Sequence, residues 1–271
     1  MRLISFLLCL IPINFCLSQQ EFFENKTEKQ LYNFNAFKAG EKLEYRLNYG
    51  FFNASYASLT LKDEVLDGKK VLRATSIGRT TGLARLFFKV DDIYETFFPK
   101  EKVKPVKSIR DIYEGGYERE AETIYDYKNN KALFYDKLKN IKKEFDIHPD
   151  IQDIISTFYY LRKHFDISSL KPNDLIYVDI FFDQEIYPFK MMFLGIERIK
   201  TKFGIVECMK LRPYMESGRV FRDNEGIKIW VTNDNNRVPI KVKADLRVGS
   251  IVANLVSFRG LANPFRIVVN E

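Results

Sequence analysis

The 271-residue sequence contains few of the side chains that most catalytic and metal sites require. It has three cysteines, two histidines and one tryptophan. His148 and His164 are sixteen residues apart and accompany no zinc-protease motif and no cysteine–histidine cluster. A glycine-rich nucleotide loop and a serine-hydrolase elbow are also missing. The sequence therefore predicts no metal, no cofactor and no recognisable catalytic nucleophile.

No concentrated block of one charge is present either. Lysine and arginine total 43 against 36 aspartate and glutamate residues, so the formal net charge is +7. The excess is spread along the chain without a run of about five or six like charges. Nucleic-acid modules need a basic stripe with interleaved aromatic side chains. The distribution is typical of a solvated basic surface, and we expect no nucleic-acid partner.

The first 18 residues have the pattern of an export signal. Arg2 supplies a positive charge, a short apolar stretch follows it, and a more polar run ends at Ser18. The apolar stretch ends at Pro12 and is too short to span a bilayer, so we expect no transmembrane span in the mature chain. Neither Cys9 nor Cys16 follows a small residue, as a lipid-modified cysteine would. We expect soluble export, to the periplasm or the medium, with a lipid anchor as the alternative.

Cleavage near Ser18 would leave Cys208 as the one cysteine of the mature chain, so no internal disulfide could form. Cys208 lies in an alternating stretch at 203–213 and has no histidine nearby in sequence. A lone cysteine in a strand is usually a small buried hydrophobic residue, and we expect that here, with a nucleophile as the alternative.

Most of the chain after Gly40 alternates apolar and polar residues with a period of two, which predicts strands. Asp67-Gly68 between two such stretches is typical of a tight hairpin turn, because both positions tolerate positive φ. The expected strands lie at 41–50, 54–66, 69–79, 90–99, 103–114 and 117–127, and then at 174–182, 187–199, 203–213, 226–232, 237–248 and 250–258.

One segment, 149–164, has a helical period instead. Pro149 suits the first turn of a helix, and the basic residues at the end of the segment suit the helix dipole. An apolar stripe at steps of three or four residues is expected to face the core, with Phe158 at its middle. The stripe consists of Ile151, Ile154, Ile155, Phe158, Leu161 and Phe165.

Together these patterns predict a mainly β protein with two curved antiparallel sheets, barrel-like or half-barrel in shape, linked by one central amphipathic helix. The expected halves are 41–147 and 174–260, with an arm at 19–40 and a tail at 261–271. Aromatic strands followed by a proline near 105 and near 239 are about 134 residues apart, which favours an internal duplication. Any two antiparallel meanders could share this order of strands, turns and prolines, so a duplication and a chance likeness both stay open.

Three stretches carry a resemblance to a known family. They are the helix motif D-x-x-S-x-x-Y-Y-x-R from Asp153 to Arg162, the opening strand at 40–50, and the strand at 90–98. Together they resemble the DUF3108 family of exported bacterial proteins, over about residues 37–260, with a single domain at 41–260. The resemblance implies an exported, mostly β protein and assigns no reaction.

The polar side of the helix carries the first group of candidate site residues. Asp153, Thr157 and Tyr160 are three or four residues apart, and Arg162 lies near the helix end. If the sheet wraps the helix, these groups must bond to one another or to nearby carbonyls. An anion site that uses Arg162 and a catalytic site are the alternatives. We expect the partner of Arg162 to lie inside the protein.

The stretch 78–88 carries the second group. Arg79 and Arg85 bracket Gly82, which breaks the strand rhythm, and four apolar residues follow within the stretch. A β-bulge or a loop packed on the core explains this pattern. The alternative is a mobile flap at the mouth of an apolar groove, with basic residues for the anionic head of an acyl chain.

Two functions from different classes fit these features. The first is a non-enzymatic protein of the cell envelope that binds a lipid, a glycan or a partner protein on a concave β-surface. The second is a hydrolase or transferase acting on an envelope polymer. Catalytic residues stay unknown, and the candidate ligand-binding residues are Arg79, Arg85, Asp153, Tyr160 and Arg162. An apolar lining of the concave surface would favour binding, and convergent carboxylates would favour catalysis.

The export signal leads to a direct prediction. Because a short apolar stretch and a small residue at Ser18 are typical of a cleaved signal, the exported protein should begin near Gln19. N-terminal sequencing or the intact mass of the exported protein measures this. A diacylglycerol group on Cys16 would contradict it.

Overall fold

The computed structural model describes residues 33–165, 169–214, 226–246 and 248–269. These residues form fourteen strands and two helices. The first eight strands are β1 (Lys42–Tyr49), β2 (Phe52–Leu66), β3 (Lys69–Thr80), β4 (Val90–Phe98), β5 (Lys107–Glu114), β6 (Tyr117–Asp126), β7 (Lys131–Asp136) and β8 (Ile141–Asp146).

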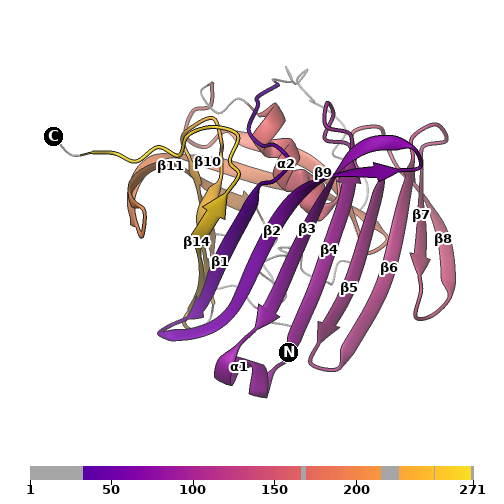
Figure 1. The fold of residues 1–271 in the computed structure, drawn as a ribbon, viewed down its shortest axis with the longest axis horizontal. Coiled ribbons are helices and arrows are strands. Elements are labelled where there is room, and N and C mark those ends of the chain that lie inside the picture. The colour runs from indigo at the N-terminus through magenta and orange to yellow at the C-terminus, as the bar shows by residue number, and fades with distance from the viewer. Residues whose placement is uncertain (1–32, 166–168, 215–225, 247, 270–271) are drawn as a thin grey trace.

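A short helix, α1 (Gly82–Phe87), joins β3 to β4, and a longer helix, α2 (Ile154–His164), follows β8. The remaining strands are β9 (Leu175–Phe182), β10 (Glu185–Thr201), β11 (Gly204–Tyr214), β12 (Ile227–Thr232), β13 (Pro239–Asp245) and β14 (Ser250–Arg259). Figure 1 shows a strongly curved sheet, with α2 at one end of strands β1 to β4 and α1 at the other end.

All fourteen strands belong to one antiparallel sheet. Its order runs from β8 back to β1 and continues from β14 back to β9. The two halves join where β1 pairs with β14, from Lys42 opposite Arg259 to Tyr49 opposite Ile251. The expected division into two sheets is therefore wrong. Without this pairing, β1 and β14 would each present an edge of unpaired N–H and C=O groups. Their pairing satisfies the backbone groups of both strands.

The curved sheet is barrel-like but not closed, because its edge strands β8 and β9 are not hydrogen-bonded to each other. The segment between β8 and α2 crosses the gap. Ile147 donates its N–H to the Asn130 carbonyl at 2.9 Å, and Gln152 forms a parallel bridge with Ile180 of β9. This crossing places α2 against β3, β4 and β9.

The twelve strands expected from the period of two are all present, and the hairpin at Asp67-Gly68 has positive φ at both positions. The sequence did not predict β7 and β8, so the halves hold eight and six strands. The segments near 105 and 239 that favoured a duplication lie in the two hairpins β4–β5 and β12–β13. The duplication itself stays a prediction.

Helix α2 begins later than the sequence pattern indicates. Asp153 is the N-cap, and a reciprocal capping box joins it to Ser156. The Asp153 carboxylate accepts from the Ser156 N–H at 2.7 Å, and the Ser156 hydroxyl accepts from the Asp153 N–H at 2.8 Å. Pro149 is therefore not in the first turn. The residues before the cap are extended because Gln152 is bonded to β9.

The buried face of α2 also differs from the expected stripe. Tyr159 and Ser156 are completely buried and Arg162 is 3% exposed, whereas Phe158 and Leu161 are only partly buried. The helix is rotated toward the side that the sequence marks as polar. The physical reason is that the sheet supplies partners for these polar groups, so their burial leaves few of them unsatisfied.

The arm and tail expected at 19–40 and 261–271 both reach the sheet in their described parts. Residues 33–40 pack on α2, where Phe37 meets the rings of Phe98 and Tyr159 edge-on at 6.4 and 4.8 Å. In the tail, Phe265 stacks on Phe258 at 4.6 Å. The aromatic side chains of the arm therefore belong to the core. Residues 19–32, 270 and 271 lie outside the described residues.

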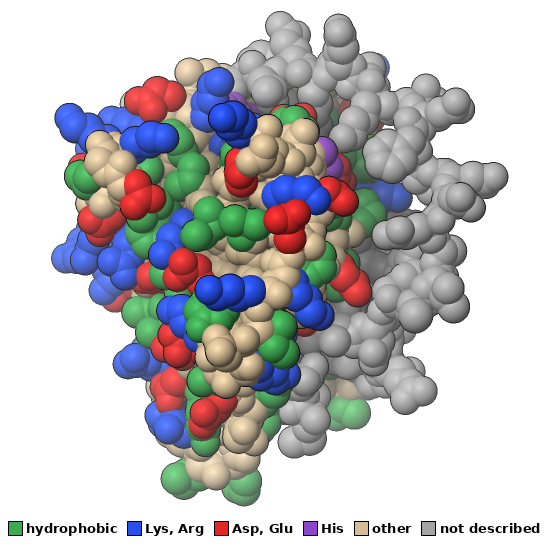
Figure 2. All heavy atoms as spheres, turned by 90° about the vertical axis from the view of Figure 1, so that its right-hand side faces the viewer, with side chains coloured by type: hydrophobic (Ala, Val, Ile, Leu, Met, Phe, Trp, Pro, Cys, Tyr) green, Lys and Arg blue, Asp and Glu red, His purple; other side chains and the backbone are tan. Residues whose placement is uncertain are grey.

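The outer surface is mixed in charge. Figure 2 shows basic, acidic and hydrophobic side chains intermingled on the face near β7 and β8. This agrees with a basic excess that is spread along the chain. Among the described residues, neither helix is long and apolar enough to cross a membrane.

Tyr159 provides a test of the core. Its hydroxyl is buried and finds no hydrogen-bond partner among the described residues. An unsatisfied buried hydroxyl is destabilising by roughly 1–3 kcal/mol, so Tyr159→Phe should raise the free energy of unfolding by about 1 kcal/mol. Urea denaturation measures this change.

Tyr45 is the matched control, because its hydroxyl donates to the Pro239 carbonyl at 3.0 Å. Tyr45→Phe should lower the free energy of unfolding by about 1 kcal/mol. If the two variants lose the same stability, the Tyr159 hydroxyl has a partner after all.

Candidate functional site

The five sequence-predicted site residues form two groups at opposite ends of the sheet. Arg79 lies near the end of β3 and Arg85 on α1. Asp153, Tyr160 and Arg162 lie on or directly before α2, at the other end of the strands (Figure 1). One ligand-binding site therefore does not bring all five together. Their roles in binding stay predictions.

Arg79 and Arg85 meet at one carboxylate, that of Asp91 on β4. Arg85 binds it through both Nη atoms, at 3.0 and 2.7 Å, and the Arg79 Nε lies 3.5 Å from Oδ1. Lys89 adds a third cation at 3.6 Å. The hydrogen bond from Arg85 is the main cause that lowers the pKa of Asp91. The cluster thus contains three cations and one anion. The loop packed on the core that the sequence led us to expect as one possibility does not form here.

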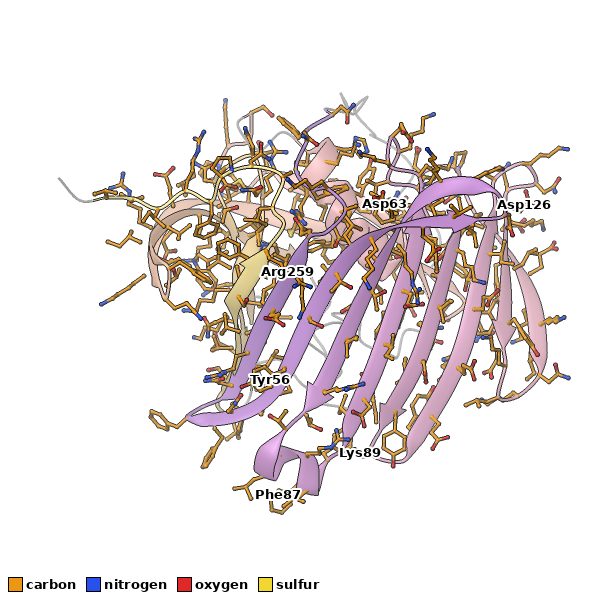
Figure 3. The ribbon with its side chains drawn as sticks, viewed as in Figure 1. Tyr56, Asp63, Phe87, Lys89, Asp126 and Arg259 are labelled. Carbon is orange, nitrogen blue, oxygen red and sulfur yellow. The ribbon has the colours of Figure 1, made fainter. Side chains whose placement is uncertain are left out.

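The stretch 78–88 forms α1 at the outer end of the sheet. Gly82 has a φ of +53°, which lets the chain turn from β3 into the helix. None of the residues of α1 is buried, and Phe87 is 87% exposed. In Figure 3 the Phe87 side chain lies at the outer tip of the sheet, with Lys89 close above it.

Arg162 has the internal partner that the sequence led us to expect. Its guanidinium bonds both oxygens of Glu41 at 2.6 and 2.7 Å, in the fork geometry that arginine favours. Nε donates to the Asn236 carbonyl and Nη2 to the Ala36 carbonyl, both at 2.9 Å. Glu41 itself is 2% exposed. Arg162 therefore joins α2, the arm and the β12–β13 turn.

Asp153 is fully buried at the start of α2. Besides the capping box, its Oδ2 accepts from the Thr96 hydroxyl of β4 at 2.5 Å. Burial raises the pKa of Asp153 to about 6, against the lowering effect of the Ser156 and Thr96 hydrogen bonds. A carboxyl group with this pKa can take up or release a proton near neutral pH.

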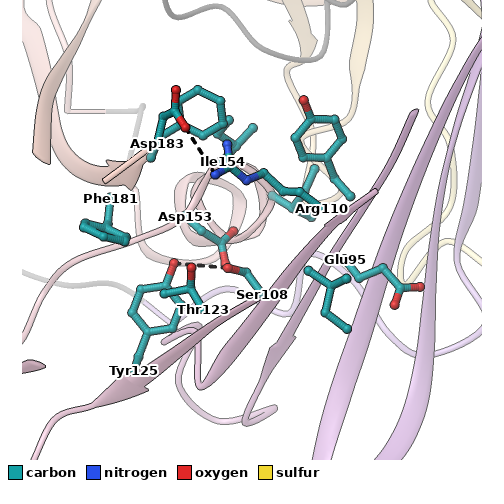
Figure 4. A pocket seen from close by; sticks show the side chains of 13 residues that line it. Glu95, Ser108, Arg110, Thr123, Tyr125, Asp153, Ile154, Phe181 and Asp183 are labelled. Carbon is teal, nitrogen blue, oxygen red and sulfur yellow. Dashed lines mark hydrogen bonds and ion pairs between the residues drawn. The ribbon is translucent and has the colours of Figure 1, made fainter. Parts of the chain in front are cut away.

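Asp153 also borders a small polar cavity between α2, β4–β6 and the tip of the β9–β10 hairpin (Figure 4). The cavity has a volume of about 20 Å³, which is room for one water molecule. Within its wall the Ser108 and Tyr125 hydroxyls lie 3.3 Å apart. The cavity is too small for a lipid or a sugar.

An ion-pair cluster in the same wall was not predicted from the sequence. Asp183, at the tip of the β9–β10 hairpin, pairs with Arg119 and lies 3.5 Å from Arg110. The Arg110 guanidinium also stacks over the Phe182 ring, 4.6 Å from its centre. The cluster holds the hairpin against β5 and β6 across the gap in the barrel. Its one sequence signal is the alternation that places both arginines on the inner face.

Tyr160 lies partly buried on the flank of α2, where its ring is 5.1 Å from that of His164. Burial is the main cause that raises the pKa of Tyr160, with a smaller effect from Asp150. A role of Tyr160 in ligand binding stays a prediction. Cys208 is buried as expected, and burial raises the pKa of its thiol to about 12.

A further feature of the inner face is a set of small side chains on β2 and β3, which we call the small-residue row. These residues share the face that carries the core residues Leu59 and Ala74. The register places Ser55 opposite Thr80, Ala57 opposite Gly78, and Ser76 opposite Leu59. The row consists of Ser55, Ala57, Ser76, Gly78 and Thr80.

The row runs from α2 toward the end of the sheet that carries α1. The Ser76 hydroxyl is completely buried and finds no hydrogen-bond partner among the described residues. Ala57 is only partly buried although it faces inward. The sequence offered a signal for this row in the low bulk of ASYAS and TSIG, which the strand pattern alone did not use. Elsewhere in the described part of the chain, no group of three metal-binding side chains occurs.

Comparison with known families gives one match. The model of the family described as "Protein of unknown function (DUF3108)" matches residues 44–256. This confirms the resemblance seen in the helix and strand motifs. A search of curated proteins finds no match.

Two solved structures are similar to this chain. A protein of Brucella abortus, described as a beta-barrel-like protein of the domain of unknown function DUF1849, has a TM-score of 0.52 at 10% identity. The similarity covers 83% of this chain and 99% of that chain. A DUF1089 family protein of Pseudomonas aeruginosa has a TM-score of 0.39 at 12% identity, covering 70% and 89%. The first similarity supports a barrel-like fold and says nothing of activity.

The raised pKa of Asp153 predicts a pH dependence of stability. Between pH 4 and 6 the folded protein binds more protons than the unfolded chain, so stability falls as pH rises. The contribution is fully present below about pH 4 and lost as pH rises through about 6. Asp153→Asn keeps a good N-cap and should remove this loss, which is roughly 3 kcal/mol.

Urea denaturation from pH 4 to pH 7 measures the difference between wild type and variant. Asp150→Asn is the control, since Asp150 is an exposed carboxylate three residues earlier. It should follow the wild-type curve. Parallel curves for wild type and Asp153→Asn would mean that Asp153 titrates normally.

Proposed function

The chain belongs to the DUF3108 family, and from this membership and the geometry of its sheet we propose that it is an exported cell-envelope protein that binds a ligand on its concave β-surface. The proposed activity is binding without catalysis, in the periplasm or outside the cell. The export signal at residues 1–18 supports the location. Of the three ligand classes considered, lipid, glycan and partner protein, the inner face favours a lipid.

The observation that carries this proposal is the small-residue row. Side chains as small as Ala57 and Gly78 occupy little volume on the inner side of β2 and β3, where larger residues would fill a barrel of this size. The buried hydroxyl of Ser76, which finds no hydrogen-bond partner among the described residues, gives this face one polar group that a ligand could bond. A site with much apolar surface and few polar groups is typical of a ligand pocket.

The same composition separates a lipid from a glycan. Each hydroxyl of a buried sugar needs a partner, and an unpaired one costs roughly 1–3 kcal/mol. The row offers only three hydroxyls, those of Ser55, Ser76 and Thr80, and the Thr80 hydroxyl already accepts from the Val90 N–H at 2.9 Å. An acyl chain makes no such demand.

One observation favours the alternative, a hydrolase or transferase acting on an envelope polymer. A buried carboxyl group whose pKa is raised to about 6, as in Asp153, is common in active sites. Its oxygens, however, cap α2 and bond Thr96, and the cavity beside it has room for only one water molecule. The proposal therefore assigns Asp153 a structural role.

The test places a larger side chain in the small-residue row. Ala57→Leu places three more carbon atoms on the inner face of β2, and it should lower the amount of lipid that copurifies with the exported protein by about tenfold or more. Native mass spectrometry and analysis of the organic extract measure the bound lipid. Thermal melting verifies that the variant is folded.

Ser58→Leu is the matched control, since Ser58 is the next residue on the same strand and faces outward. It should retain the wild-type amount of lipid. The proposal fails if the wild-type protein carries no lipid, or if both variants keep it equally. A bound envelope polymer that the protein cleaves would support the alternative.

A further inference from the structure

Exposed apolar side chains gather at the end of the sheet opposite α2. They come from α1 and from two hairpin turns, β1–β2 and β13–β14. Phe51 is fully exposed, and Leu86 and Phe87 are 80% and 87% exposed. We call this set the apolar rim, and it consists of Phe51, Phe52, Leu83, Leu86, Phe87 and Val248.

Hydrogen bonds hold the three parts of the rim side by side. The Thr81 N–H at the start of α1 donates to the Ala54 carbonyl of β2 at 3.0 Å. The Tyr49 hydroxyl donates to the Val248 carbonyl at 2.9 Å, and the Gly50 N–H to the Ser250 carbonyl at 3.3 Å. The rim is therefore one continuous feature. Figure 2 shows hydrophobic side chains at this lower tip of the molecule.

Packing in the core does not explain why these residues are apolar. Helix α1 buries none of its side chains, yet three of its six residues are large and apolar. Single exposed apolar residues are normal on a protein surface, but a contiguous set on projecting tips marks an interaction site. The residues are placed to contact something outside the chain.

Positive charge accompanies the rim. On the outer face directly behind it, three cations, Arg79, Arg85 and Lys89, surround the one carboxylate of Asp91. These four groups leave a net charge of +2. Figure 3 places Lys89 close above Phe87, on the side toward the sheet. Further along the same face, Arg46 on β1 adds a positive charge, and Asp111 on β5 and Glu118 on β6 add negative charges.

The apolar rim and the cations behind it are therefore layered as in a protein surface that contacts a membrane. Apolar side chains at the tips can enter the acyl region, while basic groups one layer behind stand at the level of the phosphate groups. Anionic lipids attract such basic groups electrostatically. A second protein with a complementary surface would need no such layering.

We propose that the apolar rim docks the protein onto a lipid bilayer that contains anionic lipids. The docked protein sits on the membrane surface, with α1 and the β1–β2 turn inserted. Ser55 and Thr80, which pair at the rim end of the small-residue row, are then the row residues nearest the bilayer. Docking does not depend on the proposed lipid site, but it would place the entrance of that site at the membrane.

Vesicle sedimentation tests the docking. The exported protein should sediment with vesicles of equal parts phosphatidylglycerol and phosphatidylcholine, and less with phosphatidylcholine alone. The double variant Leu86→Glu with Phe87→Glu should lower the partition coefficient onto the mixed vesicles by about tenfold or more. Val65→Glu is the control, since Val65 is 62% exposed at the far end of β2. It should leave the coefficient unchanged.

A second pair of variants tests the charge. Arg79→Glu with Lys89→Glu should lower binding to the mixed vesicles and weaken its dependence on salt, with little effect on the neutral vesicles. Lys62→Glu, an exposed lysine near the far end of β2, is the control. Circular dichroism verifies the fold of each variant.

Two results would overturn the proposal. One is a wild-type protein that does not sediment with either vesicle, or rim variants that sediment as well as the wild type. The other is a dimer in sedimentation velocity that the rim variants abolish, without vesicle binding, since the rim would then be an interface between two copies. Ala57→Leu separates the two lipid proposals, because it should lose copurified lipid and still bind vesicles.

Discussion

The buried ion pair between Arg162 and Glu41 is the interaction on which the arrangement of α2, the arm and the sheet depends. The guanidinium bonds the Glu41 carboxylate and also carbonyls of Ala36 and Asn236, so one side chain joins two separate segments, the arm before β1 and the β12–β13 turn, to α2. Asn236 extends the connection, because its side chain bonds the carbonyls of Asn263 and Pro264. Removing either charge would leave the other buried without compensation, a loss of roughly 3–5 kcal/mol. Such a pair contributes less to net stability than to fixing one arrangement, and here it determines where α2 lies in the sheet.

That position follows from the path of the chain. After β8 the chain stands at one edge of the sheet, and β9 must form the other edge, so the segment before α2 crosses the gap in the barrel. Gln152 pairs with β9 on the way, and the Asp153 cap starts the helix where Thr96 can reach its carboxylate. The ion pairs of Asp183 with Arg110 and Arg119 hold the β9–β10 hairpin on the other side of the crossing. The barrel is thus completed by side chains and by one crossing segment where backbone pairing stops.

The strands and turns could be read from the sequence because their signals are local. Alternation over eight or more residues and the Asp67-Gly68 turn depend on neighbours in the chain. Strand β8 gave no such signal, because IKKEFD carries four charged residues and no clean alternation. The buried face of α2 was predicted only in part. Ile151 and Ile155 of the expected stripe are buried, but Arg162 counts as polar until its partner is known. That partner lies 121 residues away, and no spacing within the helix indicates it. The candidate site residues were hard to predict for the same reason. The inner face of the sheet is assembled from strands of both halves, so neighbours in space are far apart in the sequence.

The two ends of the sheet differ in what their residues do. At the α2 end, aromatic rings, the ion pair and the capping box are used by the fold, and groups such as Arg162 and Asp153 have their bonds within the chain. At the α1 end, the inner face carries small side chains and the tips carry exposed apolar ones, neither of which adds to the core. Both features fit the proposed contacts, of the row with a ligand and of the tips with a surface outside the chain.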